Sequence, residues 1–282
     1  MGTSGVIMGV RQENSTNYEH PDEPNLLNLH KALEYNNFGK PILRTTGSNL
    51  QWLIDISLGN IDGIGNVFRH GYNSNFANNV EESYWTGSSA YPWATWDAAG
   101  AVTLDFTSSS ASDTMQLQIE GLNANYEMQS ETITLNGTSI VTTTKSYIRV
   151  NDVTNATATN LVGAVSGKLH GTATVVAYVN AATNHSQNGF YTVPAGYNGL
   201  LLQGSVTIGK GQDGEMRFKY KLFGKTFVTS HIVLLYQNPY TYTFSVPMVL
   251  PPKTDLDVTM IAANTGTASS CQYNLLLVAV DA

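Results

Sequence analysis

Charge is scarce in this chain of 282 residues: Lys, Arg, Asp and Glu together make up 12% of it, about half of the ~25% that is usual in globular domains. The 14 basic residues are outnumbered by 21 acidic ones, and they form no basic stripe. A protein that neutralises a run of phosphates needs such a stripe, so nucleic-acid binding is not expected. Weak charge leaves little repulsion between copies, which favours a component of an assembly.

Cysteine and long apolar segments are scarce as well. Cys271 is the one cysteine, so no disulfide can form within the chain, and its apolar neighbours predict a buried thiol. No stretch reaches the ~18 apolar residues that a membrane-spanning helix needs, and the N-terminus shows no signal-peptide pattern. We therefore expect synthesis in the cytoplasm and no membrane partner.

Residues 1–47 predict an extended N-terminal arm rather than a domain, because Gly, Asn, polar residues and prolines follow one another there without a period. One short helix is expected at Leu26–Tyr35, with Leu26, Leu29 and Leu33 on one face. That face would dock into a groove of another chain. A second helix, or a strand, is expected at Asn49–Leu58.

The remaining sequence predicts a mainly β protein with two antiparallel β regions. The first, 48–163, is expected to be an N-terminal β domain. It has an irregular connection at Asn60–Asn79, then short alternating segments and a hairpin turn at Asn136-Gly137. The second, 164–282, has six expected strands between residues 199 and 280, separated by Gly, Pro and Asn turns that include Asn238-Pro239 and Pro251-Pro252, and this is typical of a jelly-roll-like sandwich. Three of these strands are Lys225–Tyr236, Tyr240–Val246 and Leu256–Ala263. No helical period longer than two turns follows residue 60, which excludes a parallel α/β enzyme fold.

The sequence carries no pattern typical of catalysis. The six histidines lie far apart, without the spacing of a zinc site, and no nucleophile elbow or phosphate-binding loop is present. Calcium ligation or solvation fits the three carboxylate pairs better than hydrolysis does: Glu81-Glu82, Asp213/Glu215 and Asp255/Asp257. We therefore expect a non-enzymatic protein without a cofactor, and calcium at the last two pairs stays open.

One dense aromatic cluster, at residues 84–96, supplies the candidate contact residues Tyr84, Trp85, Tyr91, Trp93 and Trp96. Trp and Tyr dominate interface hot spots, and their rings can stack on sugars. A cluster buried against another chain would indicate assembly, and an open groove would indicate glycan recognition. The third possibility is that the cluster is core. Core or interface is favoured over glycan binding.

Several segments after residue 65 have a distinctive pattern: F-x-x-G-x-N, then an acidic pair before a Trp, then an aromatic turn. They are Phe68-Arg69-His70-Gly71-Tyr72-Asn73, Val80-Glu81-Glu82-Ser83-Tyr84-Trp85 and Ala90-Tyr91-Pro92-Trp93, followed by Ile119–Tyr126, Glu131–Thr138, Val141–Lys145 and Val246–Leu256. This pattern resembles that of virion structural proteins of tailed bacteriophages, marine ones especially. The resemblance covers about residues 65–282 and brings no catalytic residues with it.

The resemblance implies a particle component, namely a capsid decoration, collar or tail appendage. Such a protein is located in the virion, and its partners are other virion proteins and copies of itself. We expect a homo-oligomer, with a trimer favoured over a hexamer. A carbohydrate-binding host-adhesion module, with host surface glycans as partners, is the alternative. A glycan-degrading enzyme is a third possibility, and the choice between head and tail stays open.

Overall fold

The computed structural model describes residues 34–35, 41–42, 55–181 and 183–280. The chain divides into two compact units, 1–61 and 62–282. In the first unit, β1 (Glu34–Tyr35) pairs antiparallel with β2 (Pro41–Ile42), so the C-terminal end of the expected helix Leu26–Tyr35 is a strand. Residues 55–57 are helical, and Gly59 ends that turn with a φ of 71°. The rest of the expected arm lies outside the described residues.

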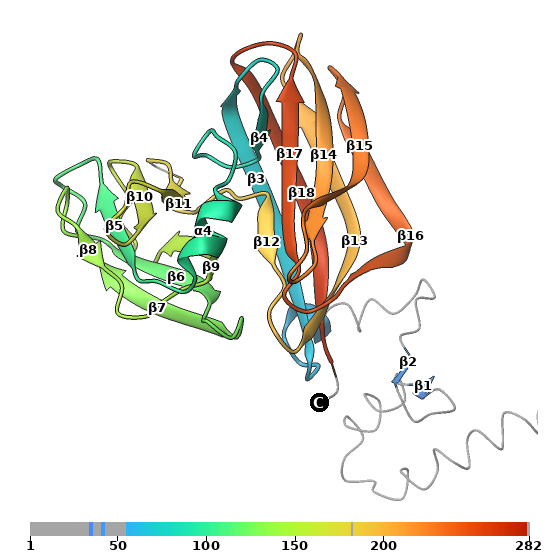
Figure 1. Cartoon of the computed structure of the whole chain (residues 1–282), viewed down its shortest axis with the longest axis horizontal. Helices are drawn as coiled ribbons and strands as arrows, with labels where there is room; N and C mark the ends of the chain where they lie inside the picture. Colours follow the sequence, from blue (N-terminus) through green and yellow to red (C-terminus); the bar gives the residue numbers. More distant parts are fainter. Residues whose placement is uncertain (1–33, 36–40, 43–54, 182, 281–282) are drawn as a thin grey trace, which may run out of the picture. The chain divides into compact units, whose positions relative to one another are not determined.

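The second unit is built on a sandwich of two antiparallel sheets, which confirms the mainly β fold (Figure 1). One sheet has the order β16-β13-β18-β3 and the other the order β12-β17-β14-β15, with β4 also paired to β17. The strands are β3 (Ile64–Phe76), β4 (Glu81–Ser83), β12 (Phe190–Thr192), β13 (Tyr197–Ile208), β14 (Asp213–Lys221), β15 (Val228–Tyr236), β16 (Tyr240–Leu250), β17 (Asp255–Ala262) and β18 (Thr267–Ala279).

The order of these strands is that of a jelly roll. Every connection in the sandwich crosses from one sheet to the other, except the one between β14 and β15. β4 and β12 occupy one strand position, because residues 81–83 pair with 261–259 of β17 and residues 190–192 pair with 257–255. The chain leaves that position after Ser83 and returns to it at Phe190. One strand of the jelly roll is therefore split by an insertion, residues 84–189.

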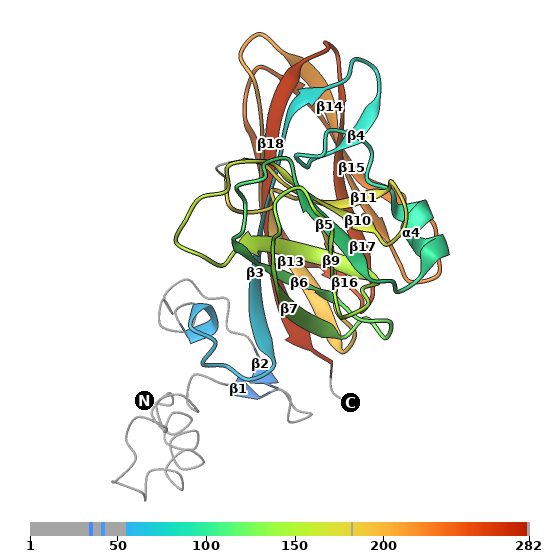
Figure 2. The same cartoon turned by 90° about the vertical axis from the view of Figure 1, so that its left-hand side faces the viewer.

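The insertion forms its own β domain around a core that includes most of the aromatic cluster. Its two small antiparallel sheets have the orders β11-β10-β5-β8 and β7-β6-β9. The elements are α4 (Trp93–Ala99), β5 (Leu104–Ser108), β6 (Gln116–Leu122), β7 (Met128–Thr134), β8 (Val141–Thr142), β9 (Arg149–Asn155), β10 (Val165–Leu169) and β11 (Val175–Val179). Figure 2 shows this inserted domain in front of the sandwich.

Strand pairing places the domain border elsewhere than the expected position between residues 163 and 164. β10 and β11 lie beyond that position, yet β10 pairs with β5 of the inserted domain. β3 lies before it, yet it pairs with β18 near the C-terminus. The sequence pattern located strands but could not show which distant strand each one joins, and a split strand separates its two halves by more than a hundred residues.

The expected irregular connection at Asn60–Asn79 is wrong for most of its length. β3 runs through it as a 13-residue strand and pairs with β18 along nearly all of that length. Its Asn and Gly residues have low β propensity, which the long ladder with β18 overrides. Gly71 is required by packing: a Cβ there would lie 2.4 Å from the backbone nitrogen of Gly189 and 2.6 Å from the Tyr84 carbonyl oxygen.

Candidate functional site

The aromatic cluster is part of the core of this chain, so it offers no surface to a partner or a ligand. Tyr84, Trp85 and Trp96 are at most 1% exposed, and Tyr91 and Trp93 are below 9%. Tyr84 packs in the sandwich core, and the other four pack in the core of the inserted domain. The expectation of an exposed cluster as a contact site is therefore corrected, and core, one of the three alternatives, holds within this chain. The other candidates, Leu26, Leu29 and Leu33, lie outside the described residues.

The polar atoms of the cluster are satisfied within the chain. The Trp85 indole Nε1–H donates to the Ser89 carbonyl oxygen at 2.8 Å, and the Tyr91 hydroxyl donates to the Val176 carbonyl oxygen at 2.9 Å. The Trp93 Nε1–H donates to Oδ2 of Asp257 on β17, also at 2.8 Å. This last bond crosses from the inserted domain to the sandwich, so the cluster helps to hold the two together.

The same junction holds a group of paired charges. Arg149, 1% exposed, donates from Nε and Nη2 to the two Asp255 oxygens at 3.0 and 2.9 Å, and it also bonds Asp97. Lys221 Nζ lies 2.6 Å from Asp97 and 2.9 Å from Asp255. Burial alone would raise the pKa of Asp97, but the hydrogen bonds from Lys221 and Arg149 hold that pKa below its usual value. These charges satisfy one another, and the arrangement binds the inserted domain to the sandwich.

Asp257, next to this group on β17, has a different environment. Its Oδ2 accepts from Trp93 and from the Ser83 hydroxyl at 3.0 Å, while its buried Oδ1 has no hydrogen-bond partner among the described residues. Burial raises the pKa of the Asp257 carboxyl to about 7, against the lowering effect of the two hydrogen bonds. Asp257 is thus a carboxyl whose charge the fold disfavours.

One member of each carboxylate pair considered for calcium is bound by an arginine, while Oδ1 of Asp213 and Oδ1 of Asp257 have no hydrogen-bond partner among the described residues. Asp255 is bonded by Arg149, and Glu215 accepts from Arg217 Nε at 2.6 Å. Within residues 34–35, 41–42, 55–181 and 183–280, no group of three or more His, Cys, Asp or Glu side chains could hold a metal ion. No helix in the described part of the chain has the length and apolar character needed to cross a bilayer. Cys271 is 3% exposed, as its apolar surroundings predicted.

A group of exposed apolar side chains on the sandwich follows β15 and β16, the edge strands of its two sheets, which we call the β15–β16 edge. Each strand pairs on one side only. Seven large apolar side chains there are between 43% and 77% exposed: Val228, Ile232, Leu234, Tyr236, Tyr240, Val246 and Val249. Figure 1 places this edge on the side of the sandwich opposite the inserted domain.

The sandwich interior reaches the surface at this edge. A hollow of about 260 Å³ lies between the two strands, and its apolar lining includes Phe218 from β14, Val233 from β15, and Tyr242 and Phe244 from β16. The His231 ring packs against Tyr242 and Phe244, with centroids 6.5 and 5.5 Å apart. Phe218 is 1% exposed, whereas Val233, Tyr242 and Phe244 are only partly buried, so the core is open at its outermost layer.

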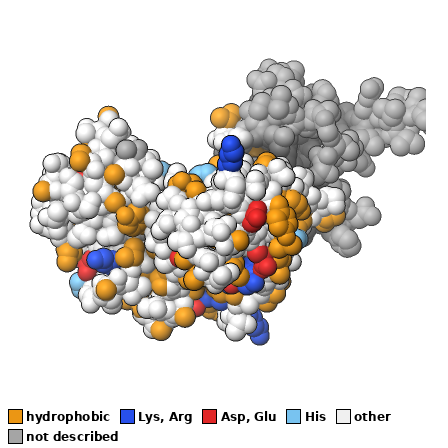
Figure 3. Space-filling model, turned by 90° about the horizontal axis from the view of Figure 1, so that it is seen from above, with side chains coloured by type: hydrophobic (Ala, Val, Ile, Leu, Met, Phe, Trp, Pro, Cys, Tyr) orange, Lys and Arg blue, Asp and Glu red, His pale blue; other side chains and the backbone are white. Residues whose placement is uncertain are grey.

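No charged side chain protects the β15–β16 edge. Residues 226–252 contain no Asp, Glu, Lys or Arg, although a stretch of this length at the chain's average would hold several. Figure 3 shows how few charges the molecule presents from above. Natural edge strands usually carry Lys, inward charges, Pro or bulges that prevent pairing with another chain; here a register shift in each ladder and Pro247 in β16 are present, but charges are not. The nearest charges are on β14, where Arg217 pairs with Glu215 and Glu81, so they form a polar rim.

Sequence analysis did not single out this edge, although the sequence contains the signal. Alternation and turns marked the two strands, at Lys225–Tyr236 and Tyr240–Val246, but not their position at the ends of the sheets. The uncharged stretch 226–252, together with two expected strands inside it, was the available indication. The absence of charged residues, apart from Lys225, from two consecutive expected strands indicates an exposed apolar edge, whereas the net charge of the whole C-terminal region does not.

No family model matches the chain, and no curated protein matches its sequence. Among solved structures, the VP2 subviral particle of infectious bursal disease virus is similar at 8% identity and a TM-score of 0.22. The alignment covers 82% of this chain and 78% of the VP2 chain. For the T=1 particles derived from the same virus, the alignment covers 78% of this chain and 66% of the other chain, at 11% identity and a TM-score of 0.21. The Gt strain of that virus gives 10% identity and a TM-score of 0.19. The neighbours are thus viral capsid structures, but at these scores the likeness does not establish a shared fold.

Proposed function

We propose that this chain is a non-enzymatic virion structural protein of a tailed phage that assembles with copies of itself through the β15–β16 edge. The observation that carries the proposal is the open, uncharged end of the sandwich. The residue patterns shared with phage virion proteins and the low overall charge support the particle context. A capsid-decoration or tail-appendage role fits both, and synthesis in the host cytoplasm precedes assembly.

A second copy of the chain fits this edge better than a partner of different chemistry. The seven exposed side chains lie on the edge strands of both sheets, and a second copy that covers them would remove their apolar surface from water. The two edge strands carry no charge to be matched by a charged partner, and their unpaired backbone groups can pair with an edge strand of a second copy. We propose a trimer, which requires a head-to-tail contact such as β15 of one copy against β16 of the next, since pairing of two identical strands would give a dimer. Residues 1–47 are a second proposed contact, on sequence grounds alone.

The test is sedimentation of the full chain and of two double variants at micromolar concentration. Ile232→Lys with Leu234→Lys places two charges on β15, where both side chains are 58% exposed. Ile140→Lys with Val162→Lys is the matched control on the inserted domain, where the side chains are 64% and 62% exposed. We expect an oligomer for the native chain and the control, and a monomer for the β15 variant. A monomeric native chain, or equal dissociation of both variants, would refute the proposed contact.

The virion context needs its own experiment, because many proteins self-associate. Purified phage particles labelled with an antibody against this chain should show it at regular positions on the head or the tail by electron microscopy. Absence of the chain from particles would remove the virion assignment and leave the self-association result intact. We also propose that the chain hydrolyses neither polysaccharide nor peptide, and turnover that a single carboxylate substitution abolishes would contradict this.

A further inference from the structure

His231 is the one histidine in the uncharged stretch 226–252 that forms the β15–β16 edge. Phe218 of β14 lies directly across from it in the strand pairing, and Phe218 belongs to the sandwich core. Side chains directly opposite each other in a sheet lie on the same face. The His231 ring therefore lies on the inner side of β15, and it is nevertheless exposed in the single chain because the edge is open.

The immediate neighbours of His231 are aromatic rings and a hydroxyl group. Its ring lies parallel to that of Tyr242 and edge-on to that of Phe244, both on β16. Its Nδ1 lies 2.7 Å from the Ser230 hydroxyl oxygen. None of the described residues that line the hollow at this edge is Asp, Glu, Lys or Arg, so a charged imidazole would have no counter-ion there.

The titratable groups that face the sandwich interior from the neighbouring strands supply no counter-ion either. They are four phenols and one thiol: Tyr220 of β14, Tyr240 and Tyr242 of β16, and Tyr273 and Cys271 of β18. Phenols and thiols ionise well above pH 7, and burial raises the pKa of Tyr242, Tyr273 and Cys271 further. These groups are neutral wherever an imidazole changes its charge.

The charges closest to this position along β14 lie on the other face of the sheet. Arg217 and Lys219 flank Phe218 in the sequence, so alternation along the strand directs them away from the core. Both contact Glu81 of β4, at 2.9 and 2.7 Å. This ion group is thus separated from His231 by the sheet itself.

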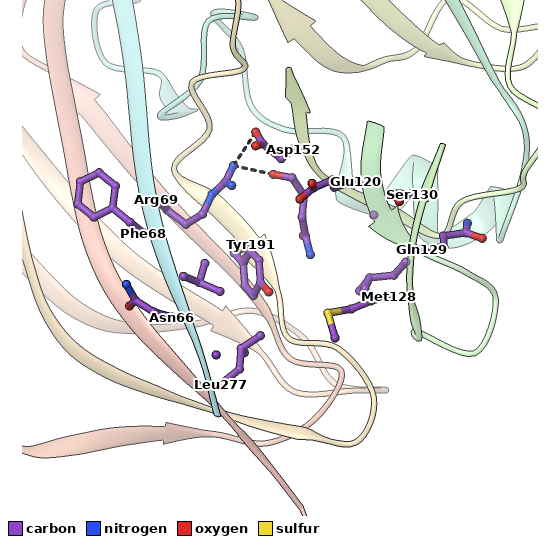
Figure 4. A pocket seen from close by; sticks show the side chains of 15 residues that line it. Asn66, Phe68, Arg69, Glu120, Met128, Gln129, Ser130, Asp152, Tyr191 and Leu277 are labelled. Carbon is purple, nitrogen blue, oxygen red and sulfur yellow. Dashed lines mark hydrogen bonds and ion pairs between the residues drawn. The ribbon is translucent and has the colours of Figure 1, made fainter. Parts of the chain in front are cut away.

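His185 of the inserted domain has the opposite environment. Its Nε2 lies 2.9 Å from Asp152, the carboxylate that also contacts Arg69 in Figure 4. A proton gained by His185 strengthens an existing pair with that carboxylate. A proton gained by His231 instead adds an unpaired charge to an apolar surface.

We infer that association through the β15–β16 edge is controlled by pH, with the imidazole of His231 as the group that titrates. This inference rests on the proposed assembly, in which a second copy covers the edge and removes water from the ring. Inward-pointing charges are one device by which natural edge strands prevent pairing with another chain. The neutral ring leaves the edge free to associate, whereas the protonated ring places such a charge in the contact, where it would be buried without a partner.

The size of the effect follows from the ordinary ionisation of histidine near pH 6.5. A head-to-tail contact that accepts only the neutral ring loses association constant in proportion to the protonated fraction, which is about tenfold between pH 7.5 and pH 5.5. Attraction of the cation to the rings of Tyr242 and Phe244 does not offset this loss. Those rings belong to the same chain and face His231 before association as well as after it.

The test is sedimentation of the full chain at pH 7.5 and at pH 5.5, at one ionic strength. His231→Phe keeps an aromatic ring that cannot be protonated, and His231→Lys places a permanent charge at the same position. His170→Gln is the control for loss of a histidine, since the His170 side chain is 60% exposed on the inserted domain. Circular dichroism at both pH values checks that each variant is folded.

We expect the native chain and His170→Gln to associate at pH 7.5 and to do so about tenfold more weakly per contact at pH 5.5. His231→Phe should associate equally at the two pH values, and His231→Lys should be a monomer at both. A native oligomer whose strength does not change with pH, or an equal loss at pH 5.5 in His231→Phe, would overturn this inference and leave the proposed assembly standing. A native chain that is monomeric at both pH values would refute the assembly, and this inference with it.

Discussion

The jelly-roll sandwich has two edges, and the chain covers one of them with an inserted domain and leaves the other exposed. At the β3, β4 and β12 edge, the chain inserts a whole domain and joins it to the sandwich through buried ions and hydrogen bonds. Arg149 to Asp255, Arg69 to Asn151 and Trp93 to Asp257 are the contacts that cross this junction. At the β15–β16 edge, no strand among the described residues pairs with the outer side of β15 or β16, and these strands carry exposed large apolar side chains and no charge.

The difference fits a contact made once during folding at the covered edge and the proposed contact between molecules at the β15–β16 edge. A buried ion pair requires accurate geometry, which a covalently connected insertion provides, and such pairs specify one arrangement at a cost in desolvation. An uncharged apolar edge imposes no such geometry and gains free energy from burial alone. We therefore expect changes at the covered edge to alter the stability of the monomer, and changes at the bare edge to alter association.

The largest effect should come from breaking the ion group of the covered edge. Arg149→Ala leaves Asp255 buried without its guanidinium partner, and removal of one partner of a buried pair costs about 3–5 kcal/mol. Lys145→Ala, at an exposed position, is the control and should change the free energy of unfolding by less than about 0.5 kcal/mol. Urea denaturation of both variants measures the difference, and similar values for the two would show that the junction contributes little.

The sandwich was the part of the fold that sequence could predict. Alternation and turns at Asn238-Pro239 and Pro251-Pro252 bracket β16, and the expected strand Leu256–Ala263 nearly coincides with β17. Local pattern suffices there because each strand has one buried face. The mainly β class and the jelly-roll-like arrangement both followed from these segments, since six such strands with short turns have few other ways to close a core.

The rest could not be predicted because it depends on contacts between distant residues. β3 is rich in Asn and Gly and is a strand because β18 pairs with it about 200 residues later. The cluster at 84–96 is core because the inserted domain folds over it, and no local signal distinguishes a buried Trp from an interface Trp. In the sequence, Phe68 stands out only within the F-x-x-G-x-N segment, and its position on the sheet face follows from the register with Asn274.

A second effect at the covered edge should appear as a pH dependence caused by Asp257. In the unfolded chain its carboxyl ionises near pH 4, whereas burial raises its folded pKa to about 7. Between those values the unfolded chain has released a proton that the folded chain keeps, so rising pH favours unfolding in that window. Asp257→Asn removes this contribution, and its stability relative to the native chain should rise by about 2–3 kcal/mol between pH 5 and pH 8.

The measurement is urea denaturation of the native chain and the variant across that pH range. Only the change in their difference with pH matters, since the amide also alters the hydrogen bonds to Trp93 and Ser83 by a constant amount. Asp62→Asn, at an exposed carboxyl, serves as the control for the exchange of an Asp for an Asn. A pH-independent difference for Asp257→Asn would show that this carboxyl is ionised throughout the range in the folded protein.

A third prediction concerns the close contact between β3 and the chain at Gly189, where it returns from the inserted domain. Gly71→Ala places a methyl group 2.4 Å from the backbone nitrogen of Gly189, and because backbone atoms cannot move aside as a flexible side chain can, overpacking should cost about 1–3 kcal/mol. Gly65→Ala, in the same strand, meets only the Leu277 Cβ at 3.8 Å and should be neutral or slightly stabilising. Thermal unfolding of the two variants gives the comparison, and equal melting temperatures would mean that this crossing is loose.

The smallest effect on the monomer should come from the bare edge. The pair Ile232→Lys and Leu234→Lys changes side chains that point to solvent on β15 of the isolated chain, so at concentrations low enough to dissociate any oligomer the free energy of unfolding should change by less than about 0.5 kcal/mol. The same pair should nevertheless abolish association, because two lysines per copy would have to be buried without partners in the contact. Denaturation at high dilution, followed by sedimentation at higher concentration, separates the two quantities. A loss of 2 kcal/mol or more in the dilute monomer would contradict the comparison, since it would mean that β15 stabilises the sandwich as a core strand does and that the edge is bare only in appearance.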